Sequence, residues 1–156
     1  GFARPGENRQ LSIYSGLQEM QSETKPDDLV IIHDAARPCL TKKLLQECIC
    51  AAEGHDGVLP VLSMKDTVYY SDDGMHVDKL LKRSKVLAGQ APEAFRFGKY
   101  LEANRTLLPE QILQINGSTE PAILAGMDIV TIPGDERNYK VTTQEDLKRF
   151  REEMEK

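Results

Sequence analysis

Apolar residues follow two spacings along this chain, and together the spacings predict an alternation of strands and helices. Apolar runs at residues 29–32, 58–62, 86–90 and 129–132 have the length of strands, and the first suits a strand buried on both faces of a parallel sheet. Helical spacing predicts helices that start at Arg9, after Thr41, at residues 92–108, at residues 118–126 and after residues 142–145. Strands that alternate with helices indicate an α/β layered sheet.

Capping residues and helix breakers set the boundaries of these elements. Asn8 and Thr41 are expected to cap two of the helices, and residues 142–145 have the pattern of a capping box. Pro60 predicts that residues 58–62 form an edge strand or contain a bulge, because proline lacks the N–H that a central ladder uses. The closing helix is expected to place its apolar residues inward, namely Leu147, Phe150 and Met154.

A hairpin is predicted in the middle of the chain. Residues 67–70 and 76–81 favour strands, and the turn sequence Ser-Asp-Asp-Gly at residues 71–74 lies between them. A hairpin inserted into an α/β chain usually projects from the sheet. The alternative is a solvated surface hairpin with no further role.

The first strand leads directly into residues that can carry chemistry. Residues 29–32 are followed by His33, Asp34, two alanines, Arg37 and a proline. Ligands of open α/β sheets bind beyond the carboxyl ends of strands, so Asp34 and Arg37 lie where a site is expected. A polar loop in which Asp34 pairs with Arg37 is the alternative, and His33 is interpreted as a structural residue.

The composition narrows the class of protein further. The 156 residues are 40% hydrophobic and 29% charged, which fits one folded domain with a sizeable core. A net charge of -5 provides no global basic field for nucleic acid or a membrane surface, so an anionic ligand would need local basic residues. No apolar run approaches the length of a membrane span. Cys39, Cys48 and Cys50 lack metal-ligand spacing and indicate reduced thiols in a cytoplasmic protein, with Cys48 in the core.

Six segments carry a family resemblance. They are residues 33–38 with the sequence HDAARP, residues 6–12, residues 65–67, Arg83 with residues 89–95, residues 119–120 and residues 138–142. In this order they resemble the 2-C-methyl-D-erythritol 4-phosphate cytidylyltransferase family and its close relative ribitol-5-phosphate cytidylyltransferase. Members of the family begin with a Gly-rich loop whose arginine and lysine hold the nucleotide triphosphate. No such loop precedes Gly6, so we expect residues 1–156 to be a single domain from the C-terminal portion of a longer enzyme.

The resemblance implies both a fold and a reaction. The fold is a Rossmann-like nucleotidyltransferase sheet with helices on both faces and a β-hairpin arm at about residues 64–85, which in the family embraces a second subunit of a homodimer. The reaction is the transfer of CMP from CTP to 2-C-methyl-D-erythritol 4-phosphate, with Mg²⁺ and with release of pyrophosphate. Ribitol 5-phosphate stays open as the acceptor. Such transfers depend on placed cations more than on proton shuttling.

The resemblance also implies roles for individual residues. The candidate catalytic residues are the acid that would hold Mg²⁺ and two cations that would meet phosphate, namely Asp34, Arg83 and Lys140. The candidate substrate-binding residues are Arg9, Arg37, Thr67 and Thr119. The candidate nucleotide-binding residues are Gly6, Glu7, Ser12 and Ala35. In the family, the residues that match Thr67 and Arg83 reach the substrate phosphate in the neighbouring subunit.

Some positions depart from the family pattern. Glu120 stands where the family usually has Asp, and Pro121 follows it unusually. Ala91 and Glu93 stand where the family usually has Thr and Gln. These departures leave open the interpretation that the protein is a diverged homologue of the family. An alternative outside the class of enzymes is a dimeric binding module without catalysis of its own.

Overall fold

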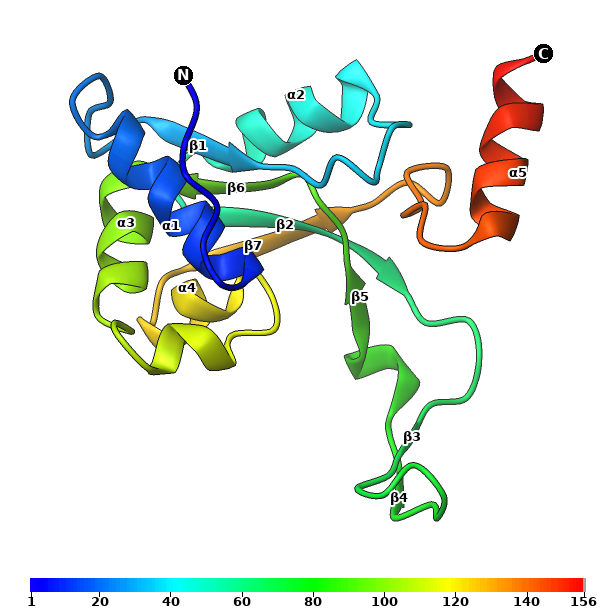
Figure 1. Ribbon diagram of the computed structural model, residues 1–156. Coiled ribbons are helices and arrows are strands. Elements are labelled where there is room, and N and C mark those ends of the chain that lie inside the picture. The colour runs from blue at the N-terminus through cyan, green and yellow to red at the C-terminus, as the bar shows by residue number, and fades with distance from the viewer. Residues whose placement is uncertain (156) are drawn as a thin grey trace.

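The computed structural model describes residues 1–155, which form a mixed five-stranded sheet, a separate two-stranded hairpin and helices on both faces of the sheet (Figure 1). The sheet consists of β1 (Leu29–Ile32), β2 (Gly57–Ser63), β5 (Leu87–Gly89), β6 (Glu93–Arg96) and β7 (Ile129–Pro133). β6 lies between β1 and β2 and is antiparallel to both, whereas β7 is parallel to β2. The strands β1, β2 and β7 therefore run in the same direction.

The apolar run at residues 29–32 is confirmed as a strand, but its expected parallel neighbours and full burial are wrong. β1 stands at the end of the strand order and pairs with the antiparallel strand β6. Of its four residues, Val30 alone is buried. Because the direction of a neighbour depends on distant chain, an apolar run does not determine it.

Pro60 lies inside the central strand β2, where the sequence predicted an edge strand or a bulge. Along one edge of β2, β6 pairs with residues 57–58 and β5 pairs with residues 61–63. The strand pairing is interrupted between these two stretches, and Pro60 lies at this break. At this break the Gln90 N–H donates to the Pro60 carbonyl at 2.8 Å. A strand residue directs its N–H and C=O to the same side, so the N–H that proline lacks would have faced the break.

Two apolar cores cover the two faces of the sheet, which confirms the expected layers. On one face, the elements α1 (Arg9–Met20), α3 (Phe97–Arg105), η2 (Gln111–Gln114) and α4 (Glu120–Leu124) pack around Val30 and Phe95. On the other face, α2 (Lys42–Ala51) packs Cys48 against Val58 and Ala94. The rings of Phe95 and Tyr100 stack with their centroids 4.1 Å apart. None of the helices in residues 1–155 has both the length and the apolar character to cross a membrane.

The helix starts follow the expected caps, with one shift. The side chains of Asn8 and Thr41 each accept the N–H three residues on, at 2.8 and 3.2 Å. The capping box of α5 (Gln144–Met154) consists of Thr143 and Asp146, one residue later than predicted. A box needs its acid at the third helical position, and Asp146 occupies that position.

The helix predicted at residues 92–108 begins later than expected. Residues 93–96 form strand β6, and α3 starts only at Phe97. β6 pairs with β1 on one edge and β2 on the other, and Ala94 and Phe95 are fully buried. Pairing on both edges satisfies the backbone here, so tertiary structure overrides the local preference.

Helix α5 stands apart from the sheet (Figure 1), which makes the prediction of an inward apolar face wrong. None of the residues of α5 is buried, and Met154 is exposed. Contacts from the preceding loop include those of Tyr139, whose ring centroid lies 3.9 Å from the Arg149 guanidinium carbon and whose hydroxyl donates to Glu153 at 3.2 Å. Helical spacing indicates an apolar face but not the surface that covers it.

The predicted hairpin is confirmed, with shorter strands than expected. β3 (Tyr69–Tyr70) pairs with β4 (Lys79–Leu80), and the 3₁₀ turn η1 (Arg83–Lys85) follows. The hairpin projects from the sheet on two connecting segments, one of which contains η1 (Figure 1). The exposed large apolar residues of this arm are Tyr69, Tyr70, Met75, Val77 and Leu80. Apolar side chains gathered on a projecting element are typical of an interaction surface.

Candidate active site

Asp34 follows the carboxyl end of β1 and is surrounded by three cationic side chains. The Arg9 guanidinium donates to Oδ1 at 2.7 Å. Lys140 Nζ and Arg37 Nε lie 3.4 and 3.6 Å from Oδ2. We call these four residues the Asp34 cluster. Arg9 comes from α1, Arg37 from the loop after β1 and Lys140 from the loop after β7, so the fold brings three distant segments to one carboxylate.

The charges of the cluster keep Asp34 ionised. Burial raises the pKa of this carboxyl, but the hydrogen bond from Arg9 and the charges of Arg9 and Lys140 outweigh burial, so the pKa lies below its ordinary value. The side chains of Asp34 and Arg37 are 15% and 13% exposed, whereas those of Arg9 and Lys140 are 43% and 45% exposed. Arg9 and Lys140 are therefore the cations with most freedom to meet an incoming anion.

Backbone hydrogen bonds hold the loop that carries Asp34. The Arg37 N–H donates to the Asp34 carbonyl at 2.9 Å. The Val141 N–H donates to the Ala36 carbonyl at 2.7 Å, which joins the Lys140 segment to the same loop. The His33 ring nitrogen lies 3.0 Å from the Arg37 carbonyl, a contact within the loop that fits the structural role expected for His33.

Two buried amide side chains, Gln90 and Asn138, support the cluster, and the sequence analysis did not single them out. Asn138 Nδ2 donates to the Ala91 carbonyl at 2.7 Å, while the backbone carbonyl of Asn138 accepts from Arg37 at 2.7 Å. Gln90 donates to the Asp135 carbonyl and accepts the Asp135 N–H, each at 3.0 Å. These contacts tie the loop before Lys140 to the end of β5. Asn138 lies in the family-matched segment 138–142, which was the signal available for it.

Glu93 is a further residue that the sequence analysis missed, because it placed this position in a helix. Glu93 is the first residue of β6, pairs with Ile32 of β1 and is 8% exposed. Its two oxygens accept the hydroxyls of Ser118 and Thr119, each at 2.7 Å. Burial raises its pKa, and the Arg9 charge acts in the opposite direction. Glu93 thus links Thr119 to the surroundings of Arg9, and its departure from the family pattern was the available signal.

Three of the candidate nucleotide-binding residues, Gly6, Glu7 and Ser12, lie in a tight loop and the first turn at the start of α1. The Gly6 N–H donates to Ser12 Oγ at 3.0 Å, and Ser12 Oγ donates to the Asn8 carbonyl at 3.0 Å. A Cβ at position 6 would overlap the Leu11 side chain and lie 2.7 Å from the Leu11 carbonyl carbon, so only glycine fits this approach. Glu7 is exposed beside this loop. Across the cluster, Ala35 is also exposed.

Thr67 and Arg83 are not brought to the Asp34 cluster. Both belong to the segment that projects from the sheet, and Arg83 donates to the Lys65 carbonyl at 2.7 Å within that segment. Among residues 1–155, no hydrogen bond or ion pair links either residue to the cluster. Within one subunit, the predicted site residues therefore divide into a cluster and an arm.

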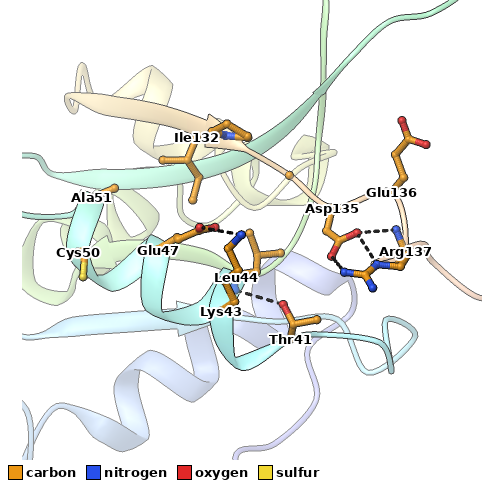
Figure 2. Close-up of a pocket in the computed structure, with 12 residues that line it drawn as sticks. Thr41, Lys43, Leu44, Glu47, Cys50, Ala51, Ile132, Asp135, Glu136 and Arg137 are labelled. Carbon is orange, nitrogen blue, oxygen red and sulfur yellow. Dashed lines mark hydrogen bonds and ion pairs between the residues drawn. The ribbon is translucent and has the colours of Figure 1, made fainter.

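A large open hollow of about 1100 Å³ lies between α2 and the end of β7, and none of the predicted site residues lines it (Figure 2). Both of its cations pair with carboxylates of the hollow: Lys43 lies 3.8 Å from Glu47, and Arg137 lies 3.1 Å from Asp135. A phosphate group needs an excess of positive charge. The Asp34 cluster sets three cations against one carboxylate, whereas two cations and three carboxylates line this hollow, so the cluster suits a phosphate better.

In the Asp34 cluster, the carboxylate of Asp34 is the one side chain that could bind a divalent cation. No group of three or more His, Cys, Asp or Glu side chains in the described part of the chain is arranged to hold a metal ion. Asp34 nevertheless fits Mg²⁺ at a phosphate site, because this ion commonly takes one or two carboxylates and completes its shell with phosphates and water. Cations already neutralise Asp34, so the ion would have to arrive with the phosphates.

Comparison with known sequences gives consistent relatives. Residues 3–155 match the family described as 2-C-methyl-D-erythritol 4-phosphate cytidylyltransferase. The chain is 35% identical over 148 residues to the protein of that name from Geobacillus thermodenitrificans, covering 94% of this chain and 61% of the relative. It is 36% identical over 148 residues to the bifunctional enzyme IspD/IspF of Gluconobacter oxydans, covering 93% of this chain and 36% of the relative. The chain thus spans less than two thirds of the length of these relatives.

Solved structures agree with the sequence matches. The structure of 2-C-methyl-D-erythritol 4-phosphate cytidylyltransferase from Francisella tularensis superposes with a TM-score of 0.86 at 24% identity, covering 95% of this chain and 69% of that one. The structure of 4-diphosphocytidyl-2C-methyl-D-erythritol synthase from Anaerococcus prevotii gives a TM-score of 0.82 at 26% identity, covering 97% and 68%. The expected Rossmann-like nucleotidyltransferase fold is confirmed. With these matches added to the fold and the cluster, the chain belongs to the 2-C-methyl-D-erythritol 4-phosphate cytidylyltransferase family.

Proposed function

We propose that the protein transfers CMP from CTP to 2-C-methyl-D-erythritol 4-phosphate and releases pyrophosphate. The observation that carries this proposal is the convergence of Arg9, Arg37 and Lys140 on Asp34 at the carboxyl end of β1. A site that gathers several phosphates needs an excess of positive charge, and this cluster sets three cations against one carboxylate. Family membership supports the choice of reaction. Because the chain spans 61% of a single-function relative, the proposal concerns the whole protein.

In the proposed reaction, an oxygen of the acceptor phosphate attacks the α-phosphorus of CTP. A new P–O bond forms, the bond to the β-phosphate breaks, and pyrophosphate leaves with that electron pair. The attacking phosphate is already ionised, so no side chain has to remove a proton from it. The residues act by holding the two phosphates in line and by cancelling their charge. Arg9 and Lys140 suit this task because they are the exposed cations of the cluster.

Asp34 has two proposed tasks. Without ligands it offsets part of the charge of the three cations, which would otherwise repel one another more strongly. With nucleotide present it would be the protein ligand of Mg²⁺, which supplies further positive charge to the phosphates when bound. The proposed contacts to the nucleotide itself are Gly6, Glu7, Ser12 and Ala35. Of these, Gly6 and Ser12 shape the loop through their mutual hydrogen bond.

We propose that the protein is a homodimer in which the arm of each subunit completes the site of the other. Two observations support this. The arm exposes apolar side chains, including Tyr69 and Leu80, and its candidate substrate residues Thr67 and Arg83 make no recorded contact to the Asp34 cluster of their own chain. In a dimer, residues on a projecting element can reach the neighbouring site.

We also propose a cytoplasmic location. Cys39, Cys48 and Cys50 are free thiols in the structure, and Cys48 packs in the core. Free cysteines of this kind are ordinary in a reducing compartment.

Pyrophosphate release from CTP and Mg²⁺ tests the reaction, with 2-C-methyl-D-erythritol 4-phosphate and ribitol 5-phosphate offered separately. We expect release with the first acceptor, and a loss of about 10²–10³ in kcat/KM for Lys140→Ala, because a cation at developing phosphate charge is removed. The matched control is Lys148→Ala on α5, which is 77% exposed and should stay within about twofold of wild type. Release with ribitol 5-phosphate alone would change the acceptor, and release with neither would refute the reaction.

Mixing two inactive variants tests the shared site. Arg83→Ala removes the arm contribution, and Lys140→Ala removes the cluster contribution. If the arm acts across the dimer, half of all dimers in the mixture contain one chain of each variant. Every such mixed dimer carries both changes in one of its two sites and retains one intact site, so activity returns to about one quarter of wild type. If Arg83 acts within its own chain, or the protein is monomeric, the mixture stays inactive. The oligomeric state is measured in parallel by sedimentation.

A further inference from the structure

Glu93 is a buried carboxylate that the proposed transfer does not use. Each of its oxygens accepts one hydroxyl, from Ser118 and from Thr119, and both contacts are 2.7 Å long. Ser118 is 2% exposed and Thr119 is 9% exposed, so Thr119 is the hydroxyl with more access to a ligand. Most buried carboxylates pair with a cation, and this one instead holds two neutral hydroxyls.

The charge of Glu93 determines the direction of these hydrogen bonds. An ionised carboxylate has no proton to give, so the hydroxyls of Ser118 and Thr119 must both donate to it. A hydroxyl carries one proton, and once that proton is committed the oxygen offers only lone pairs to other groups. Thr119 can then accept a hydrogen bond from a ligand but cannot donate one.

Two further observations agree with this arrangement of the hydroxyls. Thr119 stands at the N-cap of α4, yet its side chain makes no capping hydrogen bond, so its hydroxyl serves Glu93 instead of the helix end. The Tyr100 hydroxyl donates to the Ser118 carbonyl at 2.6 Å, which fixes the backbone next to Thr119. The segment is therefore held from the sheet by Glu93 and from α3 by Tyr100.

We propose that Glu93 is a positioning residue that makes Thr119 a receptor for a hydroxyl of the acceptor polyol and excludes a phosphate group from that contact. This inference rests on the proposed function. A phosphate dianion offers only acceptors, so it finds no donor at Thr119 and meets the negative charge of Glu93. A polyol hydroxyl offers a proton and fits. The acceptor would thus bind with its phosphate toward the Asp34 cluster and one hydroxyl toward Thr119.

A glutamine at position 93 would behave differently. Its amide group donates to one hydroxyl and its carbonyl accepts from the other, so one of the two hydroxyls would be free to donate outward. Glutamate at position 93 therefore excludes acceptor-only groups from Thr119 more strictly than glutamine would. The substitution Glu93→Gln keeps the shape of the side chain and changes only the direction of hydrogen bonding and the charge.

The test compares 2-C-methyl-D-erythritol 4-phosphate with three analogues that each lack one hydroxyl, using pyrophosphate release from CTP. In the wild-type protein we expect one analogue to lose about tenfold in kcat/KM, because Thr119 loses its donor. Thr119→Val should abolish this difference between the acceptor and the analogue. Glu93→Gln should reduce it at least about threefold. A purely structural role would instead lower the rates of all acceptors by the same factor.

The matched control is Glu102→Gln on α3, an exposed residue that pairs with Arg105 at 3.0 Å, and it should leave the ratio unchanged. Circular dichroism checks the folding of each variant, and Thr119→Val serves if Glu93→Gln does not fold. Equal ratios in the wild type, Thr119→Val and Glu93→Gln would overturn the inference while leaving the proposed function in place. Absence of pyrophosphate with every acceptor would refute the proposed function, and the inference with it.

Discussion

Replacing Asp34 by asparagine should reveal how strongly the cluster depends on one negative charge. The substitution keeps the shape of the side chain and can still accept a hydrogen bond from Arg9, which contacts Oδ1 at 2.7 Å in the wild type. It removes the charge that faces Arg37 and Lys140 at 3.6 and 3.4 Å. Three cations would then face one another without a counter-charge.

The expected loss in the free energy of unfolding is about 1–2 kcal/mol near neutral pH. Arg9 and Lys140 are 43% and 45% exposed, so water screens their share and each contributes only a few tenths of a kcal/mol up to about 1 kcal/mol. Arg37 is 13% exposed and contributes more, because a mostly buried cation without its partner is costly. The cost of burying the charged Asp34 carboxylate opposes the stabilisation by the three cations, so the net contribution to the free energy of unfolding stays small.

The same reasoning sets the pH dependence. The pKa of Asp34 in the folded protein lies below its ordinary value of 3.8, so its stabilising effect is present above that value. The effect is lost as the pH falls through the folded pKa, because the protonated Asp34 side chain of the wild type is then as neutral as the asparagine of the variant. Wild type and Asp34→Asn should therefore differ near pH 7 and near pH 5, and should converge in stronger acid, once the pH falls below the folded pKa of Asp34.

Urea denaturation followed by circular dichroism at these pH values measures the difference. The control is Asp27→Asn, an exposed residue for which the described part of the chain records no ion pair, and it should change stability by less than about 0.5 kcal/mol at every pH. Equal stability of Asp34→Asn and wild type near neutral pH would refute the account of the cluster. So would a difference that persists unchanged in acid.

Three further outcomes follow from packing and exposure. Phe95→Ala should cost about 3–5 kcal/mol in urea denaturation, because its fully buried ring stacks on a tyrosine, while Phe2→Ala, at a fully exposed side chain, should be neutral. Gly6→Ala should weaken CTP binding in calorimetry by about tenfold or more, since a Cβ has no room against the first turn of α1; unchanged affinity would show that this loop does not serve the nucleotide. Thiol labelling near neutral pH should modify exposed Cys50 well before Cys48, because burial of Cys48 raises its pKa to about 11, and faster labelling of Cys48 would contradict the core packing.

Local sequence determined most elements and their order. The caps at Asn8 and Thr41 and the apolar runs of β1 and β7 all act over a few residues, and the structure has each of them where it was expected. The hairpin is also present, but residues 71–78 connect its strands, a longer connection than the predicted turn at residues 71–74. Asp34 and Arg37 also follow from one short string, since a polar turn after a strand places them at the carboxyl end of the sheet. Such signals are readable because their interactions are short in sequence.

Only the tertiary structure decided the rest. Residues 93–96 form a strand because β1 and β2 flank them, and this pairing buries Glu93 beside Thr119. The meeting of Arg9 and Lys140 at Asp34 joins segments more than a hundred residues apart, which no local pattern encodes. The apolar face of α5 is visible in the sequence, yet the fold leaves Leu147 and Phe150 only partly buried and Met154 exposed. Periodicity specifies the shape of an element, whereas its neighbours depend on contacts that form only when the whole chain packs.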